Sequence, residues 1–155
     1  DQDVIVFVGD GSYLLQNSDI YSSVIYNKKL IIVVCDNGGH MVINRLQLAK
    51  GGKEYLCNLK SARATNLQFV DFEAHAKSMG ANGETVKSIS ELEAAFKRAK
   101  DSDKTYVISM QTHGYEWLEG SAFWESPTLE VHSSEENKKA YAEFTDGKNK
   151  QRKGV

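Results

Sequence analysis

The sequence predicts an α/β protein with a mainly parallel sheet flanked by helices. Short continuous apolar runs alternate along the chain with segments in which apolar residues recur at helical spacing. The runs at residues 4–8 and 30–35 predict strands buried on both faces, as in a parallel sheet. Residues 13–26, between the two runs, predict a helix. Strand, helix and strand of these lengths form a βαβ unit with a right-handed crossover.

The same alternation continues through the second half of the chain. The sequence predicts, in chain order, a short helix at 44–48, a helix at 72–79 ended by Gly80, a short strand at 84–87, a helix capped by Ser90 and a buried strand at 105–110. The rest of residues 37–65 predicts a long loop, and loops of this length in a compact domain are usually functional or disordered.

The pattern changes after His113, where aromatic residues gather in the segment 115–124 ahead of the single proline, Pro127. This segment favours either a lid or domain contact, or ordinary packing under a loop. Further on, Ser133 and Glu136 have the spacing of a capping box for a last helix that runs through Phe144. We expect the polar residues 146–155 to fray.

Composition limits the class of protein. A chain of 155 residues suits one compact domain, and 41% apolar with 26% charged residues is ordinary for a globular protein. A net charge of -2 disfavours nucleic acid as a partner. The longest aliphatic run, 30–34, is far shorter than the roughly 20 residues of a membrane span. Two cysteines without a CxxC spacing favour a reducing cytoplasm.

The start of the chain has neither an initiator Met nor a basic and apolar leader. Residues 1–3 lead straight into the first apolar strand. This pattern favours a piece of a longer protein in which the domain is truncated on its N-terminal side.

Polar residues follow the first two predicted strands where each strand ends. The sequence Gly-Asp-Gly-Ser stands at residues 9–12, and Asn37 follows the second strand, 27 positions after Asp10. Carboxyl ends of parallel strands meet at one edge of a sheet, and ligands of open α/β sheets bind beyond that edge. A lone Gly-Asp-Gly is a common turn. Its position between a buried strand and a helix, with an Asn after the next strand, favours a binding site.

These residue types suit a magnesium ion that carries a diphosphate. Asp10 offers a carboxylate oxygen, Asn37 an amide oxygen and Gly39 a backbone carbonyl, whereas Mg²⁺ completes its shell with phosphates and water. Gly11 and Ser12 lead into a helix N-terminus, whose free N–H groups attract anions. Gly38 and Gly39 lack a Cβ, so the backbone there could approach a ligand closely.

The same residues resemble the signature by which thiamine diphosphate (ThDP) enzymes hold magnesium and the diphosphate of their cofactor. The family builds its site between two domains, usually from two subunits. The resemblance implies a ThDP-binding fold over residues 1–131, followed by a C-terminal helix and polar tail at 132–155. It implies metal ligation by Asp10, Asn37 and Gly39, and cofactor contacts from Gly9, Gly11, Ser12, Gly38, His40 and Met41.

Within this family, the sequence is most similar to the hydrolases that open trihydroxycyclohexane-1,2-dione in inositol breakdown. The similar stretches cover most of residues 4–131 and include 9–14, 36–39, 43–47, 70–80, 89–99 and 114–116. The resemblance implies hydrolysis of a C–C bond in a cyclic diketone to give 5-deoxyglucuronate. Two departures stand out. His40 replaces an expected aromatic such as Phe, which leaves a backbone-only contact open, and residues 50–64 match weakly, which leaves the substrate open.

The resemblance also implies partners. The pyrimidine-binding domain, which carries the activating glutamate, has no counterpart in this sequence, so no catalytic residue is assigned. We expect a homo-oligomer at full length and an inactive chain in isolation. Two alternatives stay open: an acetolactate-synthase-like carboligase or decarboxylase, and a non-catalytic binding or assembly module with the same fold.

Overall fold

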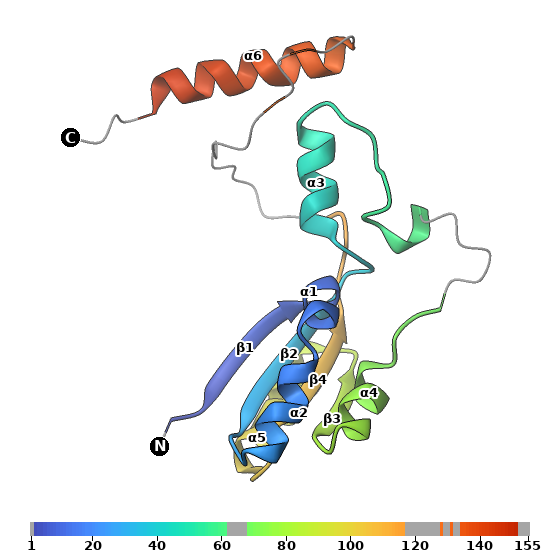
Figure 1. Ribbon diagram of the computed structural model, residues 1–155, viewed down its shortest axis with the longest axis vertical. Helices are drawn as coiled ribbons and strands as arrows, with labels where there is room; N and C mark the ends of the chain where they lie inside the picture. The colour runs from blue at the N-terminus through green and yellow to red at the C-terminus, as the bar shows by residue number, and fades with distance from the viewer. Residues whose placement is uncertain (1, 62–67, 117–127, 129–130, 132–133, 152–155) are drawn as a thin grey trace. The chain divides into compact units, whose positions relative to one another are not determined.

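The computed structural model describes residues 2–61, 68–116, 128, 131 and 134–151. The chain forms two compact units (Figure 1). The first unit comprises Asp1–His40 and Arg63–Gly114, and the second comprises Met41–Ala62 and Tyr115–Val155. Within the described residues, no helix has the length and apolar character needed to span a bilayer.

A four-stranded parallel sheet forms the centre of the first unit (Figure 1). The strands lie in the order β1-β2-β4-β3. Each strand pairs in parallel with its neighbours. Their bounds are Val4–Gly9 for β1, Leu30–Asp36 for β2, Asn82–Val86 for β3 and Tyr106–Gln111 for β4. The predicted α/β class and all four predicted strands are confirmed.

Helices cover both faces of the sheet at β2, which explains why that strand is a continuous apolar run. On one face, Ile32 and Val34 of β2 pack with residues of α1 (Asp10–Leu15), α2 (Ser18–Ile25) and α4 (Phe72–Ser78). On the other face, Ile31 packs with Ala95 and Ala99 of α5 (Ile89–Asp101). Because successive strand residues point to opposite faces, a strand buried on both sides shows no polar alternation.

β1 lies at the edge of the sheet, and its residues from Val4 to Phe7 are exposed. The prediction that residues 4–8 are buried on both faces was therefore wrong.

The predicted helix at 13–26 is two helices, α1 (Asp10–Leu15) and α2 (Ser18–Ile25). The break falls at Gln16, which has non-helical backbone angles, and the side-chain amide of the next residue, Asn17, donates to the Leu14 carbonyl at 2.9 Å. Short polar side chains compete with the helical ladder through such local bonds. The prediction of one continuous helix over 13–26 was therefore wrong.

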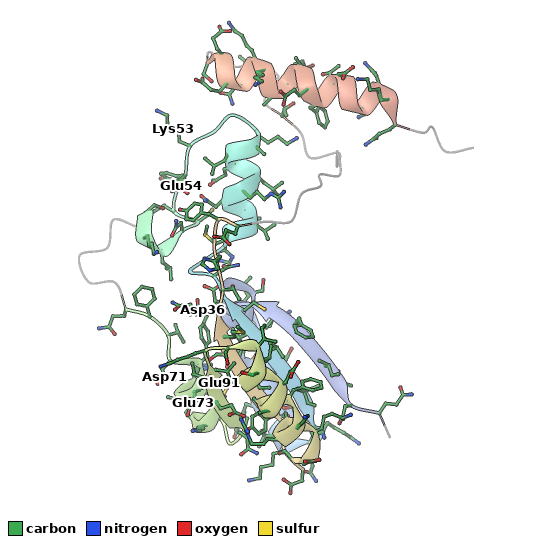
Figure 2. All side chains as sticks on the ribbon, turned by 180° about the vertical axis from the view of Figure 1, so that it is seen from behind. Asp36, Lys53, Glu54, Asp71, Glu73 and Glu91 are labelled. Atoms are coloured by element: carbon green, nitrogen blue, oxygen red, sulfur yellow. The ribbon has the colours of Figure 1, made fainter. Side chains whose placement is uncertain are left out.

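The structure also corrects the N-cap of α5. Ser88, rather than Ser90, has extended backbone angles, and its hydroxyl accepts from Glu91 N at 3.2 Å. Glu91 in turn accepts from Lys87 N at 2.7 Å, so both ends of this turn are fixed (Figure 2). Ser90 bonds only to the Ser88 hydroxyl, at 3.0 Å, and lies inside the helix.

We expect Ser88→Ala to lower the free energy of unfolding by about 1 kcal/mol, because the Glu91 N–H loses its cap acceptor. Ser90→Ala is the matched control and should cost only a few tenths of a kcal/mol, because alanine is a good helix former. Urea denaturation followed by circular dichroism measures both. Equal losses in the two variants would contradict the assignment of the cap.

The second unit contains α3 (Met41–Ala49), a short 3-10 helix at Leu59–Ser61 and α6 (Glu135–Lys150). The α3 helix is longer than the predicted 44–48. Ser134 caps α6 by accepting from Asn137 N at 3.2 Å, and Asn137 donates to the Lys50 carbonyl at 2.8 Å. The predicted cap, Ser133, and most of the aromatic segment lie outside the described residues. The α6 helix continues to Lys150, into the stretch 146–155 that was expected to fray, and residues 152–155 lie outside the described residues.

Candidate functional site

The first two strands place the predicted metal ligands at one edge of the sheet. β1 and β2 are parallel neighbours, and Gly9 at the end of β1 is opposite Cys35 near the end of β2. Asp10 is the first residue of α1, directly after β1, and Asn37 follows the last residue of β2. The prediction that Asp10 and Asn37 leave the sheet at the same edge is confirmed.

Two carboxylates hold the loop that follows β2. Asp10 is only 4% exposed, and its Oδ2 accepts from Gly39 N at 2.6 Å. Asp36, at the end of β2 (Figure 2), accepts from Gly38 N through Oδ1 at 3.2 Å. The backbone N–H groups of both glycines are therefore bound, which fixes the Gly39 carbonyl beside Asp10.

The Asn37 amide completes a group of three converging polar atoms. One terminal atom of this amide lies 2.9 Å from the Gly39 carbonyl oxygen and 3.0 Å from Asp10 Oδ1. Without a cation, the amide NH₂ takes that position and donates to both oxygens. With a cation, the amide can turn so that its oxygen takes the position and all three ligands are oxygens.

The spacing of these atoms fits magnesium. Octahedral Mg²⁺ with ligands at about 2.0–2.1 Å has adjacent oxygens about 2.9 Å apart. The two distances from the Asn37 amide, 2.9 and 3.0 Å, match that edge. Among the described residues, no group of three or more His, Cys, Asp or Glu side chains could hold a metal ion. The candidate site is therefore one where the protein supplies part of the shell and a phosphate ligand supplies more.

Negative charge is concentrated at this edge. Burial, and then the nearby charge of Asp10, raise the pKa of the Asp36 carboxyl. Asp10 itself lies in the first turn of α1, where the helix dipole stabilises an anion. A divalent cation at the group of three oxygens would offset the repulsion between the two carboxylates.

Backbone conformation is one reason for the two glycines of the loop. Gly38 has a φ of 84° and Gly39 a φ of 136°, a region that other residues rarely adopt. A Cβ at Gly38 would meet nothing within 4 Å. The loop therefore needs glycine because of its backbone angles. The close approach of a ligand to this loop stays a prediction, and the open space beside Gly38 is compatible with it.

Gly11 has a different role, which the sequence did not reveal. A Cβ built on Gly11 would lie 2.6 Å from two ring atoms of His40. The His40 imidazole thus packs against the backbone of the Gly-Asp-Gly turn, and a larger residue at position 11 would require this exposed side chain to move. The contact of His40 with the cofactor stays a prediction.

The other predicted cofactor residues lie along the same stretches of chain. Gly9 is the N-cap residue of α1, and Ser12 lies exposed in its first turn. Met41 begins α3 in the second unit and is 2% exposed, so its side chain is packed. The roles of these residues toward a cofactor stay predictions.

Sequence reasoning missed the contact that anchors α1. Tyr13 is 4% exposed, and its hydroxyl lies 2.9 Å from His75 Nδ1 on α4. Its ring meets Phe72 edge-on at 5.1 Å. The structure gives His75 a packing role with a hydrogen bond. Tyr13 and His75 are 62 positions apart in the sequence, so no local pattern predicts their contact. The one signal in the sequence was the position of Tyr13 directly after the Gly-Asp-Gly-Ser turn.

Burial raises the pKa of Tyr13 from 10.0 to about 12. Between these values the folded state keeps a proton that the unfolded chain releases, so stability falls as pH rises from 10 to 12. The loss attributable to Tyr13 is roughly 2–3 kcal/mol. We expect Tyr13→Phe to remove this part of the decline, and Tyr26→Phe, at a residue 75% exposed, to retain it. Urea titrations at pH 9 to 12 measure both, and equal slopes in the two variants would contradict the assignment.

Comparison with known proteins identifies the family. The family described as thiamine pyrophosphate enzyme, C-terminal TPP binding domain, matches residues 1–110. The chain is 34% identical over 147 residues to the 3D-(3,5/4)-trihydroxycyclohexane-1,2-dione hydrolase of Bacillus licheniformis, covering 91% of this chain and 22% of that protein. The enzyme of that name from Lacticaseibacillus casei is 30% identical over 153 residues, covering 95% and 23%.

Solved structures share the fold. A thiamine diphosphate-dependent 4-hydroxybenzoylformate decarboxylase from Rhodococcus jostii superposes with a TM-score of 0.63 at 23% identity, over 73% of this chain and 20% of that one. A benzoylformate decarboxylase from Polynucleobacter necessarius gives a TM-score of 0.59 at 23% identity, with the same coverage of 73% and 20%. The chain spans about a fifth of the length of the curated relatives it matches and belongs to the thiamine pyrophosphate enzyme family, as a C-terminal TPP binding domain.

Proposed function

We propose that this chain is the magnesium- and diphosphate-binding part of a ThDP-dependent hydrolase that cleaves a C–C bond in a cyclic 1,2-dione. The observation that carries the proposal is the convergence of Asp10 Oδ1, the Asn37 amide and the Gly39 carbonyl at 2.9–3.0 Å. This spacing supports a magnesium ion as the ligand. Family membership supports ThDP as the source of the diphosphate.

In this proposal each residue has a role in binding or orientation. The magnesium ion would be held by Asp10, Asn37 and Gly39, and it would coordinate the diphosphate. The residues expected to surround that diphosphate are Gly9, Gly11, Ser12, Gly38, His40 and Met41. When bound, ThDP supplies a thiazolium carbon that adds to a substrate carbonyl and accepts the electron pair of the breaking bond. The protein binds the cofactor and fixes its orientation.

Exposed apolar side chains support the need for a partner domain. On β1, the sheet's edge strand, Ile5 is 45% and Phe7 is 69% exposed. On α2, Tyr21 is 55% and Ile25 is 59% exposed. Apolar groups exposed at a sheet edge and along a helix mark interaction surfaces. We propose a pyrimidine-binding domain of the same or a neighbouring subunit as the partner in a homo-oligomer, which makes the isolated chain inactive.

The substrate is inferred from the relatives. Their printed name is trihydroxycyclohexane-1,2-dione hydrolase, at 34% and 30% identity for the two relatives described. This identity supports a cyclic diketone as the substrate, opened to 5-deoxyglucuronate, and a place in inositol breakdown in the cytoplasm.

A chimaera tests the proposal. This chain replaces the matching 22% of the Bacillus licheniformis hydrolase, and the product is assayed with Mg²⁺ and ThDP against the cyclic dione and against pyruvate. Turnover of the dione supports the proposal. Turnover of pyruvate alone favours a carboligase or decarboxylase, and cofactor binding without turnover of either favours a non-catalytic module. Both of the last two results would overturn it.

A further inference from the structure

The polarity of α3 is inverted relative to an ordinary surface helix. Three of its apolar side chains face outward, with Val42 60%, Ile43 48% and Leu46 41% exposed, whereas Met41 and the polar Asn44 are buried. A surface helix normally turns its apolar stripe inward. Departures of this kind from local rules are found mainly at functional or strained sites. Met41 on the inward face is explained by packing, whereas the buried polar Asn44 needs a further explanation.

Buried oxygens without a partner lie on that inward face. Among the described residues, the buried side-chain oxygens that lack a hydrogen-bond partner are Asn44 Oδ1, Gln47 Oε1 and Thr128 Oγ1, and all belong to the second unit. Asn44 and Gln47 stand three positions apart, so they are neighbours on one face of the helix. Natural proteins rarely leave buried acceptors unpaired, and each such group needs its own explanation.

The orientation of the Asn44 amide is fixed by its other end. Asn44 Nδ2 donates to Glu54 Oε1 at 2.8 Å, and an ionised carboxylate can only accept (Figure 2 labels Glu54, in the loop after α3). Glu54 also accepts from the Tyr115 hydroxyl at 2.8 Å. Asn58 donates to that hydroxyl. Because Nδ2 must be the donor to Glu54, the unpaired atom of the Asn44 amide is its oxygen.

The network extends from the interior to the surface. Asn44 is buried at one end, and Tyr115, 54% exposed, lies at the other. Side-chain hydrogen bonds between them hold the loop after α3 against the start of the segment that follows β4. The buried Asn44 amide is thus joined through Glu54 to a hydroxyl group at the surface.

We propose that Asn44 Oδ1 and Gln47 Oε1 form a paired hydrogen-bond acceptor site for neighbouring hydroxyl groups of a polyhydroxylated carbocycle. Hydroxyl groups are donors that rotate to suit their acceptor, and neighbouring hydroxyls on a ring match two acceptors side by side. A site built to accept such hydrogen bonds rejects analogues that lack the hydroxyl, because its buried acceptors then stay unpaired.

The inference rests on the proposed function for the identity of the ligand as substrate, and it names the residues that read its hydroxyl groups. Asn44 follows the proposed metal ligand Gly39 by five positions along the chain. The sequence around Asn44 and Gln47 is also one of the stretches that resemble the dione hydrolases, whose substrate name specifies three hydroxyl groups.

The test uses the ¹⁵N-labelled chain with two probes, myo-inositol and its hexa-O-methyl ether. We expect myo-inositol to shift the side-chain amide signals of Asn44 and Gln47, and the ether, which has no donors, to shift neither. Gln47→Leu should weaken inositol binding about tenfold, as expected for one lost hydrogen bond. It should also melt at the same or a higher temperature, because a buried unpaired oxygen is removed. Gln16→Leu, the same change at an exposed residue of α1's C-cap, is the control.

Several outcomes would overturn the inference: no shift with myo-inositol, equal shifts with the ether, or unchanged inositol affinity in Gln47→Leu. Any of them would leave the two oxygens as the site of a structural water. If the leucine variant does not fold, Gln47→Met makes the same test with an unbranched side chain. Binding of Mg²⁺ and pyrophosphate is measured on the same samples. Metal binding without inositol binding would contradict this inference alone. Inositol binding without metal binding would contradict only the proposed function.

Discussion

Asp10→Ala is expected to lower the affinity for Mg²⁺ and ThDP by about 100-fold or more, equivalent to roughly 3 kcal/mol. Asp10 is the only carboxylate among the three proposed protein ligands, so its loss removes the main charge that holds the cation. It also frees the Gly39 N–H, which Asp10 Oδ2 binds at 2.6 Å. Isothermal titration calorimetry on the chimaera, where the pyrimidine-binding domain is present, measures the effect.

Asp19→Ala is the control for this experiment. Asp19 lies exposed in the first turn of α2, so its replacement removes an equal charge without touching the proposed site. Affinity should stay within about twofold of the wild type. A chain that binds Mg²⁺ and ThDP equally well with Asp10 or Ala at position 10 would contradict the proposed metal site.

Asp10→Asn separates binding from folding. The amide oxygen of asparagine can still accept from Gly39 N, and the change removes a charge that faces the Asp36 carboxyl. We therefore expect the free energy of unfolding without metal to stay within about 1 kcal/mol of the wild type or to rise. Metal affinity should nevertheless fall. A variant that lost stability and metal affinity to the same degree would indicate a structural role for Asp10.

Ile108→Ala is expected to lower the free energy of unfolding by about 2–5 kcal/mol. Ile108 lies in β4 with no exposed surface and packs in a cluster with Ile31, Ala95 and Ala99. Truncation removes buried apolar atoms and leaves a cavity between the sheet and α5, because a close-packed interior relaxes only in part. Urea denaturation measures the loss.

Ile89→Ala provides the matched comparison on the same face. Ile89, the first residue of α5, is 62% exposed, so its replacement should change stability by no more than about 0.5 kcal/mol. Comparable losses at positions 89 and 108 would mean that α5 does not pack as described. They would also remove the physical reason for the apolar run at β4.

The fold class could be predicted from the sequence because it depends on local patterns. The apolar run at 30–35 is continuous because both faces of β2 are covered, and Ile31 and Ile32 do face different helices. The order of the strands could not be predicted. β4 lies between β2 and β3 through pairing of residues more than 20 positions apart, and no local pattern specifies such a partner.

The candidate site divides in the same way. Asp10 and Asn37 were predictable because each stands where a strand ends, and parallel neighbours share that edge. The contact of His40 with Gly11 and the bond between Tyr13 and His75 were not, since both join side chains whose nearness depends on packing.

By itself the sequence determined an α/β chain with a carboxylate and an amide at the ends of two strands, because secondary structure and strand polarity follow from local periodicity. Only the tertiary structure decided that the Asn37 amide lies within 3.0 Å of Asp10 Oδ1. It also decided that Asn44 faces inward with an unpaired oxygen while Val42 and Ile43 face outward. Such distances depend on how distant segments pack, and that packing is settled by the burial of the whole chain rather than by any one stretch of it.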